Sequence, residues 1–92
     1  MKEIMKEELK NLETKIKFYK DEIELDLSYI KRVQDKNNIE VILKHSRYIK
    51  ETQEKLLTIK AILKEFQILA VEEKELFVKA QELEEIINKL VY

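Results

Sequence analysis

One histidine and nineteen carboxylates are the side chains of this sequence best suited to acid–base or metal chemistry. His45 has Ile42 three residues before it and Tyr48 three residues after it, so the Glu-x-x-His pattern of di-iron helical bundles is absent. Glu40 is five residues from His45, which places it on a different face of a helix. The sequence therefore predicts no metal site and no cofactor.

The adjacent carboxylates do not converge on a common point either. In pairs such as Glu7-Glu8 and Glu84-Glu85 the side chains diverge by about 100° around a helix, whereas glycosidase-type catalysis needs two converging acids. The chain has no Gly, which excludes a P-loop or a dinucleotide fingerprint, and no Cys, which excludes a thiolate nucleophile. We expect a non-enzymatic protein without catalytic residues.

The elements that carry these side chains are predicted to be helices. In the first third, apolar positions advance by alternating steps of four and three residues, which a strand cannot produce: Met5, Leu9, Leu12, Ile16, Tyr19 and Ile23, continued by Ile30 and Val33. A second series repeats the pattern: Ile59, Ile62, Phe66, Leu69, Leu76, Ala80, Leu83, Ile87 and Leu90. We predict one all-α domain over residues 1–92, an antiparallel helical hairpin with coiled-coil-like heptad seams and helices over about 3–35 and 39–91.

The predicted turn between the two helices is the polar segment 35–38. Asp and Asn tolerate left-handed backbone and bond their own main chain, so they are the turn residues left to a chain without Gly or Pro. Asn37 is expected to cap the second helix, with Glu40 three residues on completing a capping-box-like arrangement.

Two architectures are compatible with the residues after position 70. The lack of a turn signal between 39 and 90 favours one continuous second helix, which would overhang the first and need a second chain to cover it. The alternative is a break near 71–74 that folds the last helix back into a three-helix bundle. Either form is expected to associate into a homodimer, through this candidate oligomer interface: Leu69, Leu76, Phe77, Ala80, Leu83, Ile87 and Leu90.

Two charged residues interrupt the apolar series. In an antiparallel hairpin turning at 36–38, Asp26 lies level with Arg47 and Tyr48 and within a turn of His45, so we expect it to bond one of these three across the seam. Such a polar layer fixes the register of the helices, and a ligand pocket beside it is the alternative. Glu73 marks either the bend of a three-helix form or a polar position near a dimer axis, where Lys74 or Lys79 of a partner could pair with it.

The hairpin tip is predicted to be basic. Residues 31–64 carry a net formal charge of +5, whereas residues 1–30 carry −2 and residues 65–92 carry −4. The candidate anion-binding residues at the tip are Lys31, Arg32, Lys36, Lys44, Arg47 and Lys50. Docking of nucleic-acid phosphate or an acidic protein surface is one interpretation, and a solvated tip that complements a helix C-terminus is the other.

Four apolar residues of the first helix lie off the seam: Phe18, Leu25, Leu27 and Tyr29. Phe18 and Leu25 are one heptad apart and share a face, so another helix of the oligomer or a partner protein is expected to pack there.

We therefore predict a non-enzymatic helical protein–protein interaction module of the adaptor, scaffold, chaperone or inhibitor type, acting as a homo-oligomer. The alternatives are a nucleic-acid-associated protein that uses the basic tip and a small-molecule sensor with a polar pocket near Asp26. The longest apolar run, Ile68-Leu69-Ala70-Val71, is far shorter than the roughly 20 residues that a membrane span needs. The first eight residues carry acids and lack an apolar stretch of the kind found in secretory signals, so we expect a cytoplasmic protein without a membrane segment.

Overall fold

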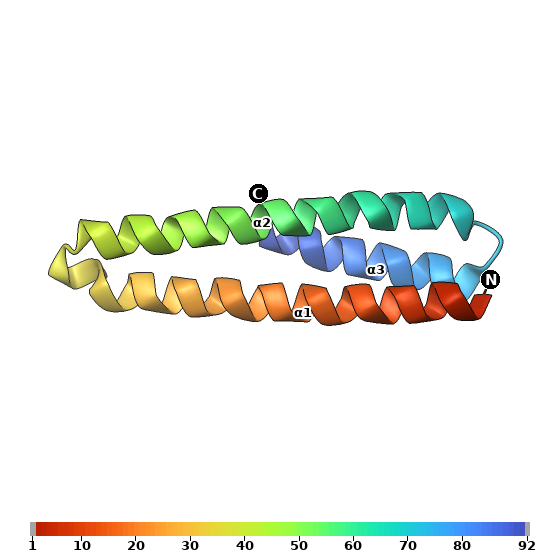
Figure 1. The fold of residues 1–92 in the computed structure, drawn as a ribbon, viewed down its shortest axis with the longest axis horizontal. Helices are drawn as coiled ribbons and strands as arrows, with labels where there is room; N and C mark the ends of the chain where they lie inside the picture. Colours follow the sequence, from red (N-terminus) through yellow and green to blue (C-terminus); the bar gives the residue numbers. More distant parts are fainter. Residues whose placement is uncertain (1, 92) are drawn as a thin grey trace.

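The computed structural model describes residues 2–91, apart from the side chain of Asp35, so the ends of the predicted 1–92 domain, Met1 and Tyr92, lie outside the description. It contains three α-helices, α1 (Lys2–Val33), α2 (Ile39–Leu69) and α3 (Lys74–Leu90), and a short 3₁₀ turn, Gln34–Lys36 (Figure 1). The helices pack into a rod of 54 × 18 × 15 Å. Residues 2–91 include no strand, and the predicted all-α class is confirmed.

The first chain reversal follows α1 at the predicted turn. Asn37 adopts the left-handed conformation with φ 53°, and its N–H donates to the carbonyl of Gln34. The side chain of Asn38 caps α2 by accepting from the N–H of Val41 at 3.3 Å. The expected cap at Asn37 is therefore wrong by one residue, because Asn37 is used for the left-handed step that turns the chain.

The second reversal corrects the favoured architecture. The continuous helix over 39–91 is wrong: α2 ends at Leu69 and α3 begins at Lys74, and α3 returns beside α1 and α2 (Figure 1). Two backbone hydrogen bonds close this turn. The N–H of Glu73 donates to the carbonyl of Ala70 at 2.9 Å, and the N–H of Phe77 donates to the carbonyl of Glu73 at 3.0 Å. No capping side chain is used at Glu73, which is why the segment carried no turn signal.

Glu73 thus lies at the bend, one of its two expected places. Its carboxylate is 3.5 Å from the ammonium of Lys2 at the start of α1. Lys79, considered as a partner for Glu73, bonds Glu13 of α1 instead, with 2.7 Å between Nζ and Oε2.

The three helices share one apolar core. Its largest fully buried side chains come from every helix: Ile16, Leu56, Leu63, Leu83 and Ile87. Ala70 and Ala80 have no exposed surface, because their small side chains let the helices approach closely around the second turn. Burial of this apolar face is what holds α3 against α1 and α2.

This core also corrects the candidate oligomer interface. Leu76, Ala80, Leu83 and Ile87 are buried inside the chain's own bundle, so α1 and α2 supply the cover that a second chain was expected to supply. Phe77 and Leu90 are half-buried, and Leu69 is 78% exposed. Of the predicted interface, these last three remain accessible.

Polar bonds hold α3 along its length. Gln67 donates to the carboxylate of Glu84 at 2.9 Å, and the side chain of Gln53 donates to the carbonyl of Leu90, the last residue of α3. The hydrogen bond from Lys79 lowers the pKa of Glu13 below its ordinary value, and the charges of Lys79 and Lys17 act in the same direction against the raising effect of burial.

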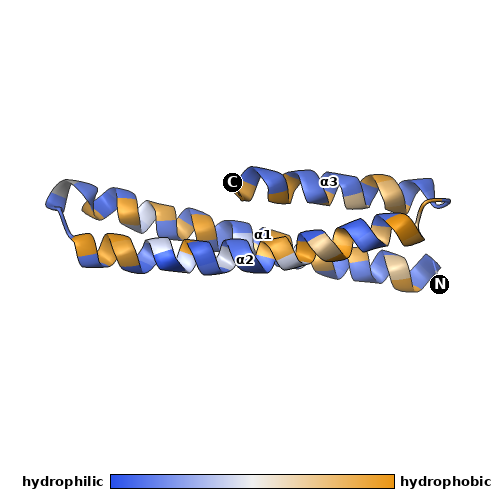
Figure 2. Ribbon diagram, turned by 90° about the horizontal axis from the view of Figure 1, so that it is seen from above, coloured by the Kyte–Doolittle hydropathy of each residue, from blue (hydrophilic) through white to orange (hydrophobic). Residues whose placement is uncertain are grey.

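The core occupies only part of the rod. α3 has 17 residues against 32 in α1, and it stops near the middle of the hairpin (Figure 2). Among the described side chains, none from residue 24 to residue 51 is buried. We call residues 24–51, which form the two-helix end of the rod, the arm, and the three-helix remainder the body.

None of the three helices is both long enough and apolar enough, over residues 2–91, to cross a membrane.

Candidate functional site

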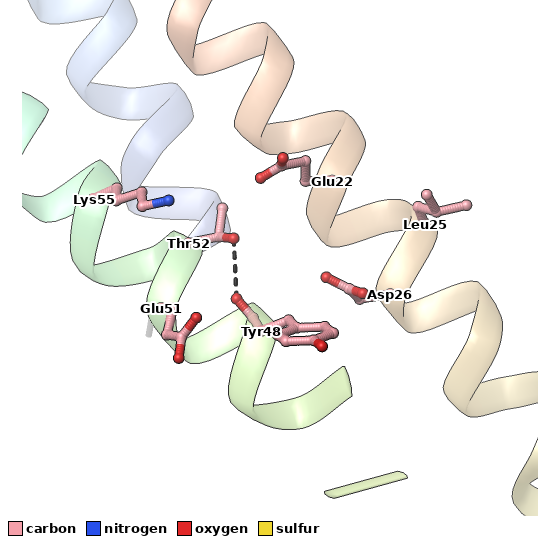
Figure 3. Close-up of a pocket in the computed structure, with 7 residues that line it drawn as sticks. All are labelled: Glu22, Leu25, Asp26, Tyr48, Glu51, Thr52 and Lys55. Atoms are coloured by element: carbon pink, nitrogen blue, oxygen red, sulfur yellow. Dashed lines mark hydrogen bonds between the residues drawn. The ribbon is translucent and has the colours of Figure 1, made fainter. Parts of the chain in front are cut away.

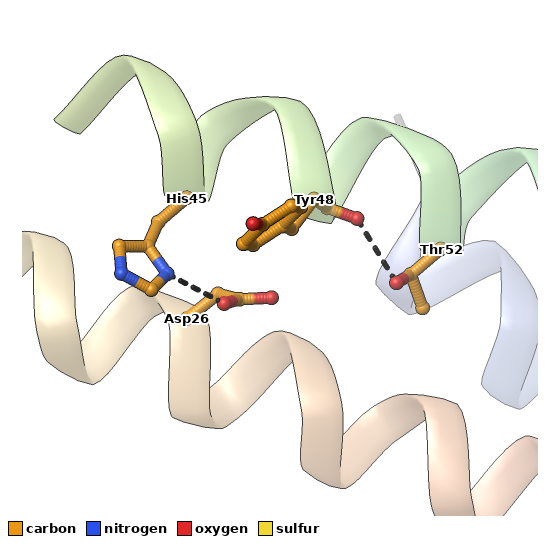
Figure 4. Close-up of polar contacts among 4 residues, drawn as sticks. All are labelled: Asp26, His45, Tyr48 and Thr52. Atoms are coloured by element: carbon orange, nitrogen blue, oxygen red, sulfur yellow. Dashed lines mark hydrogen bonds and ion pairs between the residues drawn. The ribbon is translucent and has the colours of Figure 1, made fainter. Parts of the chain in front are cut away.

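A polar layer lies at the root of the arm. The imidazole Nδ1 of His45 is 2.8 Å from a carboxylate oxygen of Asp26, across the contact between α2 and α1 (Figure 4). The two side chains are only 16% and 14% exposed, so both are largely withdrawn from water. The predicted bond from Asp26 across the seam is confirmed, with His45 as its partner.

Two tyrosines enclose this pair. The ring of Tyr29 stacks on the imidazole, with centroids 4.8 Å apart and an interplanar angle of 13°. Tyr48 meets the same imidazole edge-on at 5.7 Å. The stacked contact with Tyr29 and the perpendicular contact with Tyr48 restrict the rotation of His45, which keeps Nδ1 directed at Asp26.

The structure brings together three of the four residues proposed for the polar seam. Asp26, His45 and Tyr48 are in contact, whereas Arg47 is exposed and makes no bond to this group among the described residues. Tyr29 joins the group although it was expected off the seam, on a face covered by another helix or a partner protein. The sequence spacing could have predicted this contact, because Tyr29 lies three residues after Asp26 and therefore one helical turn along the same side of α1.

A cleft of about 280 Å³ opens beside the layer, between α1 and α2 (Figure 3). Its lining residues are Glu22, Leu25, Asp26, Tyr48, Glu51, Thr52 and Lys55. Three of them are carboxylates, one is an ammonium, and His45 is not in the lining. Within residues 2–91, no group of three or more His, Asp and Glu side chains is placed to hold a metal ion.

The six basic residues predicted for the tip are all exposed, on both helices of the arm. Two of them lie over tyrosine rings: Arg32 is 5.5 Å from the centroid of Tyr29, and Lys44 Nζ is 5.9 Å from that of Tyr48. The tyrosines therefore link the basic surface to the Asp26–His45 layer beneath it.

Exposed apolar residues cover much of the arm. Leu25, Leu27 and Tyr29 are 57%, 52% and 40% exposed, and Phe18, on the body, is 58% exposed. Ile39 and Leu43 of α2 are 66% and 59% exposed. The expectation that the four off-seam residues of the first helix are accessible is confirmed, and α2 adds further apolar surface beside them.

Comparison with known proteins gives no family for this chain. No protein family, no curated protein and no solved structure matches it. The features of this chain that bear on its function are therefore the exposed apolar surface of the arm, its polar layer and its charge.

Proposed function

We propose that this protein is a non-enzymatic helical protein–protein interaction module and that the arm is its binding surface. The observation that carries the proposal is the separation between a body with its own core and an arm without a buried side chain among its described residues. Exposed apolar surface rimmed by charge is typical of binding sites, because it gains most from being covered. The Asp26–His45 layer would keep the two helices of the arm in register before a partner arrives.

A capture experiment tests this function. Tagged wild-type protein is compared with L25E/L43E, which places charges on two sides of the arm, and with L57E as the matched control. Leu57 is 49% exposed and lies on α2 in the body, outside both the arm and the apolar end of the body, so the control adds a charge at a similarly accessible apolar position.

Partners that are lost with L25E/L43E, retained with L57E, and bound again as purified proteins would support the proposal. Circular dichroism of all three proteins establishes that the helices are intact. Equal recovery of every partner by wild-type and L25E/L43E protein would refute it.

Self-association is the second part of the proposal, through the apolar residues exposed at the end of the body. Leu69 and Val71 are 78% and 68% exposed and lie beside Met5, and Ile68 is exposed next to them. Covering this patch with a second copy would remove several aliphatic side chains from water. A dimer in sedimentation equilibrium that dissociates with L69E supports this part, and a monomer at 100 μM argues against it.

Nucleic-acid binding is the alternative favoured by the exposure of all six tip bases. Its test is fluorescence anisotropy with single-stranded and duplex DNA at 50 mM and 200 mM salt. Micromolar binding at low salt that K31E/R32E removes would support it, because phosphate contacts release counterions and weaken steeply with salt. No binding at 50 mM salt would exclude it.

Small-molecule sensing is the alternative favoured by the cleft beside Asp26. The lining has more carboxylates than ammonium groups, so a cationic compound is the expected ligand. A thermal shift with polyamines that is lost in E51Q would support it. No shift with the wild-type protein would argue against it.

A further inference from the structure

Residues seven apart along a helix form a row on one of its faces. The hydrogen bonds of α3 identify one such row beside it on α1 and another on α2. On α1 the row includes Glu13, which accepts the bond from Lys79 of α3. On α2 it includes Gln53 and Gln67, which bond the carbonyl of Leu90 and the carboxylate of Glu84. Glu13 on one side, and Gln53 and Gln67 on the other, therefore border α3 within the body.

Both rows continue into the arm, where α3 no longer covers them. Residues seven apart share a helix face with a drift of about 20°, so Leu27, fourteen residues after Glu13, continues the row on α1. Ile39, fourteen residues before Gln53, continues the row on α2. Leu27 is 52% exposed and Ile39 is 66% exposed, so each row carries an exposed apolar side chain beyond the end of α3. Ser46, which lies between Gln53 and Ile39 in the row on α2, is polar and exposed.

The apolar residues that lie between the two rows are also less buried in the arm than in the body. Ile49 and Ile42 lie seven and fourteen residues before Leu56, which has no exposed surface, yet both are only half-buried. Ile30 lies fourteen residues after Ile16, which is 1% exposed, and it too is half-buried. In the arm, α1 and α2 therefore continue the face that α3 covers in the body, and α3 ends before it (Figure 2). We call this uncovered face, between the two rows, the groove of the arm.

Charge identifies the kind of helix that fits this groove. Lys64 faces α3 and lies 3.6 Å from the carboxylate of Glu84. Lys50, fourteen residues earlier on α2, holds the corresponding position along the arm and is exposed. On α1, Lys31 corresponds to Lys17, whose charge acts on Glu13 beside α3. Residues 27–50 have six bases and two acids, a net formal charge of +4.

We propose that this groove of the arm binds an amphipathic helix of a partner protein that carries acidic residues along its flanks, in line with α3. The inference rests on the proposed function and specifies the face and the partner. Apolar side chains of the incoming helix cover Leu27, Ile39 and the half-buried isoleucines, and its carboxylates meet Lys31 and Lys50. A second copy of the arm is a poorer occupant, because two surfaces of charge +4 would face each other.

The test uses synthetic helices as probes. One fluorescein-labelled 21-residue peptide has Leu and Ile at its seam positions and Glu on both flanks. A second peptide has Lys in place of every Glu, and a third is a scrambled version of the first. We expect micromolar binding of the Glu peptide to the full chain by fluorescence anisotropy, and at least tenfold weaker binding of the other two.

Variants of the arm locate the bound helix. L27E is expected to weaken binding of the Glu peptide at least tenfold, and K50E to weaken it severalfold while improving binding of the Lys peptide. L57E is the matched control: Leu57 is 49% exposed and lies on α2 in the body, outside the arm. Its binding should stay within twofold of wild type, and circular dichroism checks the fold of each variant.

Three results would overturn this inference. They are equal binding of the Glu and Lys peptides, an equal loss in L57E and L27E, or a self-associated wild-type protein that L27E converts to monomer. The proposed function survives the first two if captured partners still depend on the arm. The proposed function is refuted by a different result, namely that L25E/L43E loses no partner in the capture experiment.

Discussion

His45 donates its Nδ1–H to Asp26 over 2.8 Å, two turns of α2 before Gln53, the residue that bonds the last carbonyl of α3. The bond therefore lies just beyond the end of the three-helix core, where the hairpin continues with two helices. At this boundary a hydrogen-bonded polar pair stands between α1 and α2 in place of apolar side chains. The two helices of the arm cannot cover apolar side chains here as fully as the three helices of the body do.

Removing one partner of this pair should cost more than removing both. D26L and H45L each leave one largely buried polar group without its bond, so each is expected to lower the free energy of unfolding by about 1–3 kcal/mol. D26L/H45L should recover about 1 kcal/mol relative to the sum of the single changes. Urea denaturation of the four proteins measures this coupling, and strictly additive losses would show that the pair contributes no specific interaction.

The bond between Glu13 and Lys79 should make stability depend on pH. Because the pKa of Glu13 is lowered in the folded state, its stabilisation is fully present above the unfolded pKa and is lost as pH falls through the folded one. Both side chains are partly exposed, 27% for Glu13 and 42% for Lys79, so water screens the pair and E13Q should cost about 0.5–1 kcal/mol at pH 7.

Urea denaturation at pH 7 and pH 3 measures this dependence. The difference between wild-type and E13Q protein should shrink toward acid pH, and a difference that grows there would contradict the assigned pairing. E24Q is the control, since Glu24 is exposed.

The return of α3 predicts a short distance between residues far apart in the sequence. In E54C/K89C the new thiols are the only ones in the chain, and both native side chains are exposed. Neighbouring helix axes are about 8–10 Å apart, so spin labels at these positions should lie within about 25 Å. A continuous helix would separate the same positions by about 50 Å, which double electron–electron resonance distinguishes directly.

Amide hydrogen exchange should separate the arm from the body. The amides of the arm are supported by no fully buried side chain among the described residues, whereas Leu56 and Leu63 have no exposed surface. Local opening should therefore exchange the arm amides of residues 27–33 and 42–48 at least about tenfold faster than those of residues 56–66. Equal protection of the two groups would show that arm and body open as one unit.

The sequence by itself determined the helices, the first turn and the partner of Asp26 to within a turn. Asn37 was the signal for the turn, because asparagine is among the few residues other than Gly that adopt left-handed backbone readily. Once that turn was placed, antiparallel pairing brought Asp26 opposite the stretch that contains His45. These features follow from local backbone preferences and from the register of one hairpin.

Only the tertiary structure decided that the chain reverses a second time. Residues 70–73 have helix-compatible side chains and no capping group, so no local preference ends the helix there. The helix ends because Leu76, Ala80, Leu83 and Ile87 leave water when α3 folds back, whereas a continuous helix would leave them exposed. The same long-range burial placed the end of α3 at the root of the arm and left the groove beyond it uncovered.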